Sequence, residues 1–179
     1  MPYSSDEGKQ FTRDVLLGFK NINHILDIGP GAGTYYNLLS RSFPDAIWTC
    51  VEAWEPYVKK FSLQDKYTSI IIDDARTIDW QSLGTYDIVI FGDVLEHMSK
   101  EEAENLVRAA HTVSRYMVIS IPIIHYPQGD LEGNPYEVHQ HHWSPESVKS
   151  DLLGGYTIEQ FAEYSVVGVY IVRGRLQDE

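Results

Sequence analysis

The amino-acid sequence predicts an α/β fold: a doubly wound, mainly parallel seven-stranded sheet with helices on both faces. Three observations support this prediction. Short apolar runs alternate with helical patterns five times, which is typical of parallel strands joined by helices. These first five runs are nearly uninterrupted by polar residues, as expected of strands covered on both faces. The last two runs, 156–164 and 166–173, are separated by one residue and therefore predict a C-terminal antiparallel β-hairpin.

The first strand and the turn after it are the centre of this prediction. Residues 24–28 form an apolar run, and helical spacing begins only after three glycines. Gly29, Gly31 and Gly33 permit positive φ angles and let a ligand touch the backbone. The helix directs unpaired N–H groups and the positive end of its dipole into the same turn. Asp27 can accept a hydrogen bond from an amine or a hydroxyl, so this segment predicts a small-ligand site.

The remaining elements follow from periodicity and from the residues that begin and end helices. Ser99 and Glu102 have the spacing of a capping box, and Ser144-Pro145 is a strong helix start. The expected helices are 4–19 (within the N-terminal segment 1–20, capped by Ser5 or Asp6), 34–42, a helix opening at Glu55-Pro56, a short piece at 76–83, 99–114 and 144–153. The expected strands are 24–28, 46–52, 67–72, 86–91, 115–121, 156–164 and 166–173.

Composition and charge limit the classes of function. The 179 residues have the length of one domain, 1–179, and 43% of them are hydrophobic. The net charge is −12 and the 14 Lys and Arg residues are scattered, which argues against a nucleic-acid partner. The single cysteine, Cys50, fits a reducing compartment, and the sequence has neither a signal-peptide pattern nor an apolar run of membrane-spanning length. We therefore expect a cytoplasmic protein without membrane contact, of undetermined oligomeric state.

Acidic residues stand at the ends of the predicted strands, where doubly wound sheets bind ligands. Glu52 follows the glycine turn by about 20–25 residues, the interval at which a second-strand carboxylate meets ribose hydroxyls. Asp74 can accept a hydrogen bond from an adenine amine, and Ala53 offers apolar surface to the ring. An adenosine ligand is implied, either a nicotinamide dinucleotide or S-adenosylmethionine. Thr34 stands where the dinucleotide pattern has its third glycine, and Asp27 suits an amino-acid amine better than a pyrophosphate.

Four segments in order make the chain resemble a class I S-adenosylmethionine-dependent methyltransferase. They are the first motif Asp27-Ile-Gly-Pro-Gly-Ala-Gly33, the ribose-binding Val51-Glu52, the adenine-contacting Asp73-Asp74-Ala75 and the fourth-strand motif Tyr86–Met98. The resemblance implies a Rossmann-like sheet and S-adenosylmethionine as the cofactor. The residues expected to bind the cofactor are Asp27, Gly29, Gly31, Gly33, Glu52, Ala53, Asp74, Ala75 and Asp93. Asp73 departs from the small residue common in the family, so the resemblance leaves open which aspartate meets the adenine.

The irregular segment 122–143 is the expected acceptor loop, because it is longer than most connections. A hydroxyl acceptor must lose its proton during methyl transfer, and histidine has the unperturbed pKa best suited to remove it at neutral pH. The candidates beyond the fourth and fifth strands are His97, His125, Tyr126, His139, His141 and His142, and from these we select His97, His125, Tyr126 and His142 as the catalytic residues. We expect no further domain that would hold a macromolecule. The sequence thus predicts O- or N-methylation of a small molecule by in-line displacement.

Three other functions compete with this prediction. The residues Asp93, Glu96 and His97, with the histidines of 139–142, resemble the metal site of the small-RNA 3′-terminal 2′-O-methyltransferases, which implies a divalent-metal-assisted enzyme acting on an RNA 3′ end. The acidic charge argues against RNA, and Asp93 replaces the expected glutamate, so the predicted site contains no metal ligand. A non-catalytic S-adenosylmethionine-binding protein would yield no S-adenosylhomocysteine. A nicotinamide dehydrogenase would be protected against unfolding by the nicotinamide nucleotide instead.

Overall fold

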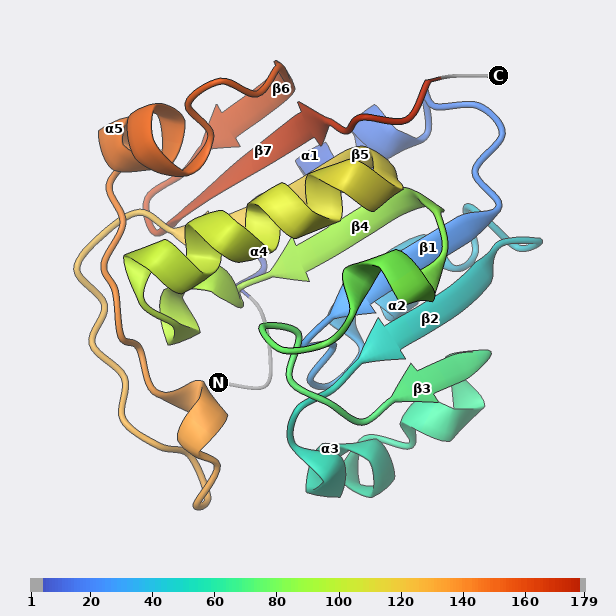
Figure 1. Cartoon of the computed structure of the whole chain (residues 1–179), viewed down its shortest axis with the longest axis horizontal. Helices are drawn as coiled ribbons and strands as arrows, with labels where there is room; N and C mark the ends of the chain where they lie inside the picture. Colours follow the sequence, from blue (N-terminus) through green and yellow to red (C-terminus); the bar gives the residue numbers. More distant parts are fainter. Residues whose placement is uncertain (1–4, 178–179) are drawn as a thin grey trace.

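The computed structural model describes residues 5–177, whose strands form one sheet in the order β3-β2-β1-β4-β5-β7-β6 (Figure 1). The first five strands pair in parallel, and β7 runs antiparallel to both β5 and β6. The predicted fold class is therefore confirmed. The strands are β1 (His24–Ile28), β2 (Ile47–Val51), β3 (Ser69–Ile71), β4 (Tyr86–Gly92), β5 (Ser114–Pro122), β6 (Ile158–Glu163) and β7 (Val167–Arg173).

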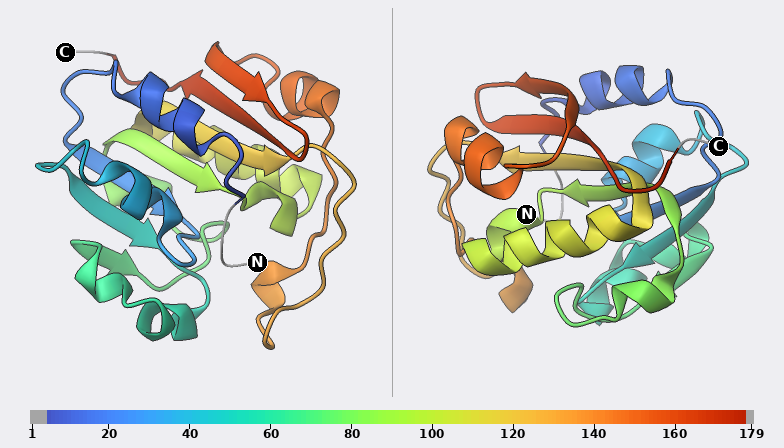
Figure 2. Two further views of the ribbon diagram at one scale, coloured as in Figure 1. Left: turned by 180° about the vertical axis from the view of Figure 1, so that it is seen from behind. Right: turned by 45° about the horizontal axis from the view of Figure 1, so that its top comes forward.

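Helices cover both faces of the sheet. α4 lies on one face and α1 and α2 on the other, as the front and back views show (Figures 1 and 2). The α-helices are α1 (Lys9–Leu16), α2 (Thr34–Leu39), α3 (Glu55–Lys60), α4 (Lys100–Val113) and α5 (Pro145–Ser147). One- or two-turn elements of other helix types are η1 (Leu63–Asp65), η2 (Trp80–Leu83), η3 (Leu95–His97), η4 (Pro135–Glu137) and the π-type η5 (Val148–Leu152).

The hydrophobic core has two parts, one on each side of the sheet, because successive strand residues point to opposite faces. On β1, Leu26 packs into the part that holds α4, and Ile25 packs into the part that holds α1 and α2. β4 alternates in the same way, with Val89 on the α4 side and Ile88 on the other. All four side chains are fully buried. This explains why the strands read as continuous apolar runs.

The N-terminal helix is the clearest difference from the sequence prediction. α1 begins at Lys9 rather than near residue 4, and its N-cap is Gly8 in the left-handed region with φ 76°. The predicted caps are wrong for a physical reason: the Ser5 backbone N–H is donated to the Asp93 carboxylate, 3.1 Å away, so Ser5 belongs to the connection and not to the helix. The first four residues of the predicted helical segment 1–20 lie outside the described residues.

The capping signals on the other helices explain their starts. Ser99 accepts from the Glu102 N–H at 3.3 Å, while the Glu102 carboxylate accepts from the Ser99 N–H at 2.8 Å, so the predicted capping box is confirmed. The helical piece expected at 76–83 is shorter, because Asp79 caps a turn that begins only at Trp80. α2 likewise ends at Leu39 rather than at residue 42.

Candidate functional site

A pocket of ≈ 380 Å³ lies at the carboxyl ends of the parallel strands, next to the boundary between β1 and β4. At this boundary the strand order reverses, which is where doubly wound sheets bind ligands. Every parallel strand from β1 to β4 contributes residues to its wall. They are Gly29, Pro30 and Gly31 after β1; Glu52 and Ala53 after β2; Asp73, Asp74, Ala75 and Arg76 after β3; and Gly92, Asp93 and Val94 at and after β4.

The glycine turn has the conformation that its residues permit. Gly29, Gly31 and Gly33 have φ angles of 59°, 50° and 76°, in the left-handed region that L side chains rarely adopt. Gly29 and Gly31 line the pocket, whereas Gly33 does not. A Cβ on Gly33 would come within 2.9 Å of the Lys66 side chain, so Gly33 serves the close packing of the turn.

Glu52 presents a largely desolvated carboxyl group to the pocket. It is 5% exposed, and its Oε1 accepts from the Trp54 N–H at 2.8 Å. Burial raises the pKa of Glu52 to about 7, although hydrogen bonds from the backbone of Trp54 and Gly31 act in the opposite direction. Hydrogen bonds from ligand hydroxyls would favour the charged carboxylate, so this environment suits a diol such as ribose.

Asp27 lies just behind the pocket rather than in its wall. It is 1% exposed and accepts from the Tyr67 hydroxyl at 2.6 Å. Burial raises its pKa to about 7, partly opposed by the Tyr67 hydrogen bond and the charge of Lys9. The sequence predicted that a ligand amine donates to Asp27; in the structure the Tyr67 hydroxyl donates to Asp27 Oδ2, and the amine contact stays a prediction.

The two aspartates after β3 both line the pocket but differ in their partners. The Asp74 carboxylate accepts from the Arg76 guanidinium, with Nη2 to Oδ2 at 2.6 Å and Nε to Oδ1 at 2.9 Å. This hydrogen bonding lowers the pKa of Asp74 below its ordinary value. Asp73 accepts from the Asp74 backbone N–H at 2.7 Å. An adenine amine that meets Asp74 therefore shares it with Arg76, whereas an amine that meets Asp73 shares it with a backbone N–H.

A second pocket of ≈ 460 Å³ adjoins the first, and the two share Asp93 and His97. Its wall comes from the N-terminal connection, η3, the end of β5 and the irregular segment after β5. The lining residues are Ser5, Asp6, Asp93, Glu96, His97, Pro122, Tyr126, Gln128, His139, Val166 and Val167. Two compartments with a common wall fit a reaction between two bound molecules.

Asp93 is held rigidly at the common wall. Its Oδ1 accepts from the Ser120 hydroxyl at 2.8 Å and its Oδ2 accepts from the Ser5 N–H at 3.1 Å. Its backbone has φ 59°, an uncommon value for a residue with a side chain, and such strain is frequent at functional sites.

The predicted catalytic residues separate into two groups. His97 and Tyr126 line the second pocket. His125 and His142 pack against each other, with ring centroids 4.1 Å apart, and line neither pocket. His139, a candidate that was not among the four selected residues, also lines the second pocket. Sequence spacing could not distinguish these neighbouring histidines.

Segment 122–143 also closes the first pocket, which the sequence did not predict. It runs along one side of the molecule and brings η4 next to α3 (Figure 1). The Tyr57 hydroxyl donates to Glu137 Oε1 at 3.0 Å across this junction, and Lys60 pairs with Glu132. Tyr57, Tyr136 and Glu137 line the pocket as a result. The only sequence signal was Asn134-Pro135, a turn start whose side-chain oxygen accepts from the Tyr136 N–H at 2.9 Å.

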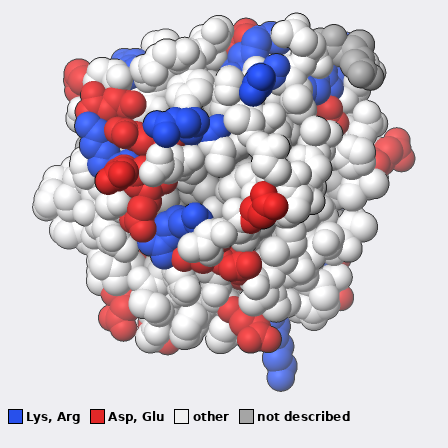
Figure 3. Space-filling model, in the orientation of Figure 1, with Lys and Arg blue, Asp and Glu red and all other residues white. Residues whose placement is uncertain are grey.

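Charged side chains of both signs are interspersed on the face of the molecule drawn in Figure 3, which has the orientation of Figure 1. The described residues form no continuous basic surface on this face. None of the helices between residues 5 and 177 combines the length and the apolar character needed to cross a bilayer.

Comparison with known proteins agrees with this geometry. A family model described as a methyltransferase domain matches residues 25–116, just over half of the chain. The N-terminal domain of EvdMO1, solved with S-adenosylhomocysteine (SAH) bound, is 18% identical with a TM-score of 0.68, over 97% of this chain and 83% of that one. The PH0226 protein from Pyrococcus horikoshii OT3 is 16% identical with a TM-score of 0.71, over 97% and 93%.

A third solved structure, the mitomycin 7-O-methyltransferase MmcR, is 18% identical with a TM-score of 0.62, over 93% of this chain and 54% of that one. At these identities the solved structures show a common fold. A search of curated protein sequences finds no match. The family match runs from β1 to the first residues of β5 and includes the glycine turn, Glu52 and Asp93. The chain thus belongs to the methyltransferase-domain family and is an S-adenosylmethionine-dependent methyltransferase.

Proposed function

We propose that this methyltransferase transfers the methyl group to a hydroxyl of a small polar molecule held in the second pocket. The observation that carries the proposal is the pair of pockets that meet at Asp93 and His97. One compartment lies at the site where the fold binds its cofactor, and the other opens beside it. Holding two reactants in alignment can contribute on the order of 7–11 kcal/mol to a transfer reaction.

The first pocket fits S-adenosylmethionine by the chemistry of its residues. The buried Glu52 carboxyl would accept from the ribose hydroxyls, and the positive-φ turn at Gly29 and Gly31 lets the cofactor approach the backbone. Asp73 and Asp74 stand where an adenine amine would donate. When bound, the cofactor supplies a methyl group that is already activated as a sulfonium. The residues of this chain therefore mainly hold the two molecules in line.

The second pocket suits a molecule with several hydroxyl groups. Asp6 and Glu96 can accept hydrogen bonds there, and Tyr126 offers both a hydroxyl and an aromatic surface. His97 and His139 add two imidazole rings to the wall of this pocket. Two of the similar structures support this class of acceptor: MmcR is named a 7-O-methyltransferase, and the EvdMO1 domain was also solved in the presence of D-fucose.

We assign His97 and Tyr126, but not His125 or His142, to the positioning of the acceptor hydroxyl. Burial lowers the pKa of His97 to about 4, so its imidazole is neutral at physiological pH.

The net charge of −12 favours a small acceptor over RNA. A cytoplasmic location stays a prediction that rests on Cys50, which is buried and free.

The test is an acceptor panel. Purified protein is incubated with S-adenosylmethionine and, separately, with monosaccharides, phenols, amines, carboxylic acids and a short RNA, and SAH formation is followed by chromatography. We expect turnover with hydroxyl compounds, and we expect Tyr126→Ala to raise the acceptor KM without changing SAH affinity. The exposed Tyr164, which lines neither pocket, gives the matched control Tyr164→Ala. Turnover confined to amines, carboxylic acids or RNA would overturn the proposal.

A further inference from the structure

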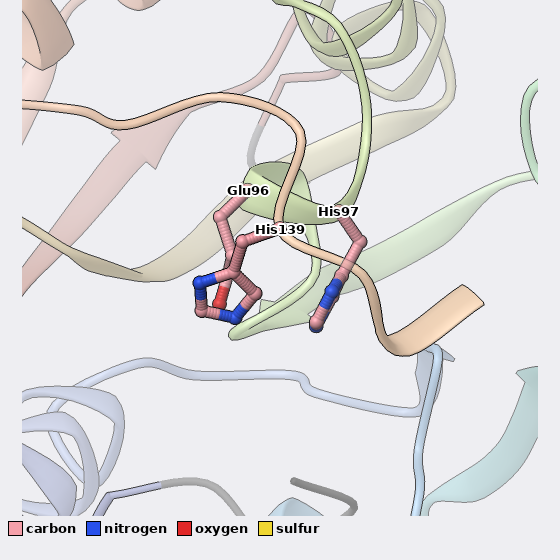
Figure 4. A group of neighbouring side chains, drawn as sticks. All are labelled: Glu96, His97 and His139. Carbon is pink, nitrogen blue, oxygen red and sulfur yellow. The ribbon is translucent and has the colours of Figure 1, made fainter. Parts of the chain in front are cut away.

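Three side chains at the wall of the second pocket have the chemistry of a metal-binding site. The ligand atoms of Glu96, His97 and His139 all lie within 4.8 Å of one another. Glu96 and His97 belong to η3, and His139 belongs to the segment that follows β5. In Figure 4 the three side chains extend to the same side, with their ends facing one another.

Two of these side chains present buried atoms that nothing in residues 5–177 satisfies. Glu96 is 2% exposed, and its Oε2 has no hydrogen-bond partner. His97 Nδ1 is also buried and without a partner. A buried carboxylate oxygen and a buried imidazole nitrogen are each costly to leave unpaired. Their common direction indicates that a group outside the described residues 5–177 satisfies both.

His139 is oriented as a metal-bound histidine usually is, and His97 presents an unpartnered ring nitrogen. His139 Nδ1 lies 2.5 Å from the Tyr126 carbonyl, so this nitrogen carries the proton and Nε2 keeps its lone pair. The Val138 backbone beside the His97 ring favours a proton on that ring, and His97 Nδ1 has no hydrogen-bond partner within residues 5–177. Metal-bound histidines characteristically donate their second ring N–H to a carbonyl or carboxylate, which fixes the free lone pair on the ion.

The backbone holds the three residues in register. The Glu96 carbonyl accepts from the Gln140 N–H at 2.8 Å and from the His141 N–H at 3.2 Å, which joins η3 to the segment carrying His139. The His139 N–H is donated to the Gln128 carbonyl at 3.0 Å. The ligand atoms of a tetrahedral ion with bonds of about 2.1 Å are about 3.4 Å apart, so small side-chain rotations close the site.

We propose that Glu96, His97 and His139 bind one first-row transition-metal ion, with Zn²⁺ as the favoured occupant. Two imidazoles and one carboxylate suit Zn²⁺ and its neighbours better than Mg²⁺ or Ca²⁺, which prefer oxygen ligands. Three protein ligands leave a coordination position open. All three residues line the second pocket, so the open position is available to a small molecule there.

This ligand set differs from the one that sequence spacing suggested. Both oxygens of Asp93 are already occupied by Ser120 and Ser5, which leaves Asp93 outside the set. His142 packs on His125 and His141 packs on Trp143, so neither is directed to Glu96. On the proposed function, an ion here would lower the pKa of an acceptor hydroxyl bound at its open position. The binding of the ion does not itself depend on that function.

Metal binding is tested on the full chain after chelator treatment and dialysis. Isothermal titration should give one Zn²⁺ per chain and no measurable heat with Mg²⁺, and Co²⁺ should give the visible absorption of a four- or five-coordinate site. His139→Ala and Glu96→Gln should each weaken Zn²⁺ binding by more than about tenfold, the effect of losing even an outer-sphere partner. His142→Ala, three residues away in the same segment, is the matched control and should keep the wild-type affinity.

The proposal is overturned if the wild type binds no Zn²⁺, or if His142→Ala weakens binding as much as His139→Ala. Thermal stabilisation by SAH, measured on each variant, shows that the fold and the first pocket are intact. If SAH does not stabilise His139→Ala, the Zn²⁺ affinity of Glu96→Gln is compared with that of His142→Ala instead. If the protein binds Zn²⁺ as described but methylates no hydroxyl compound, the proposed metal site stands and the proposed class of acceptor is wrong.

Discussion

Substitution of Asp27 by Asn should change how stability depends on pH. Asp27 is almost fully buried, and burial raises its pKa from the ordinary 3.8 to about 7. A tenfold change in proton affinity is worth about 1.4 kcal/mol, so this difference is worth about 4 kcal/mol. Because the folded-state pKa is raised, the contribution is fully present below pH 3.8 and is lost as the pH rises through 7.

The amide introduced by Asp27→Asn cannot ionise, but its oxygen can still accept from the Tyr67 hydroxyl. Between pH 5 and pH 7 the unfolding free energy of the wild type should therefore fall relative to that of Asp27→Asn. The expected difference is about 1.4 kcal/mol per pH unit, or roughly 3 kcal/mol over this range. Absolute stability at low pH can favour the wild type, since the new amide adds donors that need partners. The test is therefore the change of the unfolding free energy with pH and not its value at a single pH.

The assay is urea unfolding followed by tryptophan fluorescence at several pH values from 5 to 8, without cofactor. Trp48 and Trp80 are buried, so their emission reports unfolding. Glu52→Gln should remove a second contribution of the same sign, because burial also raises the pKa of Glu52 to about 7. The exposed Asp45 supplies the control Asp45→Asn. Parallel pH profiles for the wild type and Asp27→Asn would refute the reasoning.

Three further predictions concern the turn, the closing segment and a helix cap. Gly31→Val places a β-branched side chain at φ 50° in the wall of the first pocket, so it should abolish the stabilisation of the protein by SAH. In the wild type this stabilisation is about 2.7 kcal/mol at a hundredfold excess of SAH over its Kd. The control Gly129→Val, at a position with open space around it, should retain the stabilisation. Tyr57→Phe removes the hydrogen bond to Glu137, worth about 1 kcal/mol, and should weaken SAH binding roughly fivefold by titration. Ser99→Ala should lower the unfolding free energy by about 1 kcal/mol through loss of the α4 cap, with SAH affinity unchanged.

The parts of the fold that depend on neighbouring residues were predictable. The apolar run of β1, the three glycines and the start of α2 are contiguous, and their geometry follows from local sterics and dipoles. The capping box of α4 is also local, with partners three residues apart. The hairpin of β6 and β7 was visible because so few residues connect its strands. These patterns were sufficient for the sheet and for most of the cofactor side of the site.

The parts that depend on distant pairs were not predictable. Tyr67 meets Asp27 across 40 positions, and Tyr57 meets Glu137 across 80. Neither pair leaves a periodic trace in the sequence. The sequence therefore could not show that Asp27 accepts a hydrogen bond from Tyr67. The cap of α1 failed for the same reason, because Ser5 is bound to Asp93, 88 positions away.

The histidines of segment 122–143 show why residue type alone does not identify a site. Four histidines lie in this segment, but only His139 reaches the second pocket. Backbone hydrogen bonds determine which histidine faces the pocket. The Glu96 carbonyl accepts from two consecutive backbone N–H groups, and the Gln128 carbonyl accepts from the His139 N–H. The same segment continues from these hydrogen bonds to Glu137 at the first pocket. One irregular segment therefore completes both pockets, so its conformation determines the walls of the first and the second pocket together.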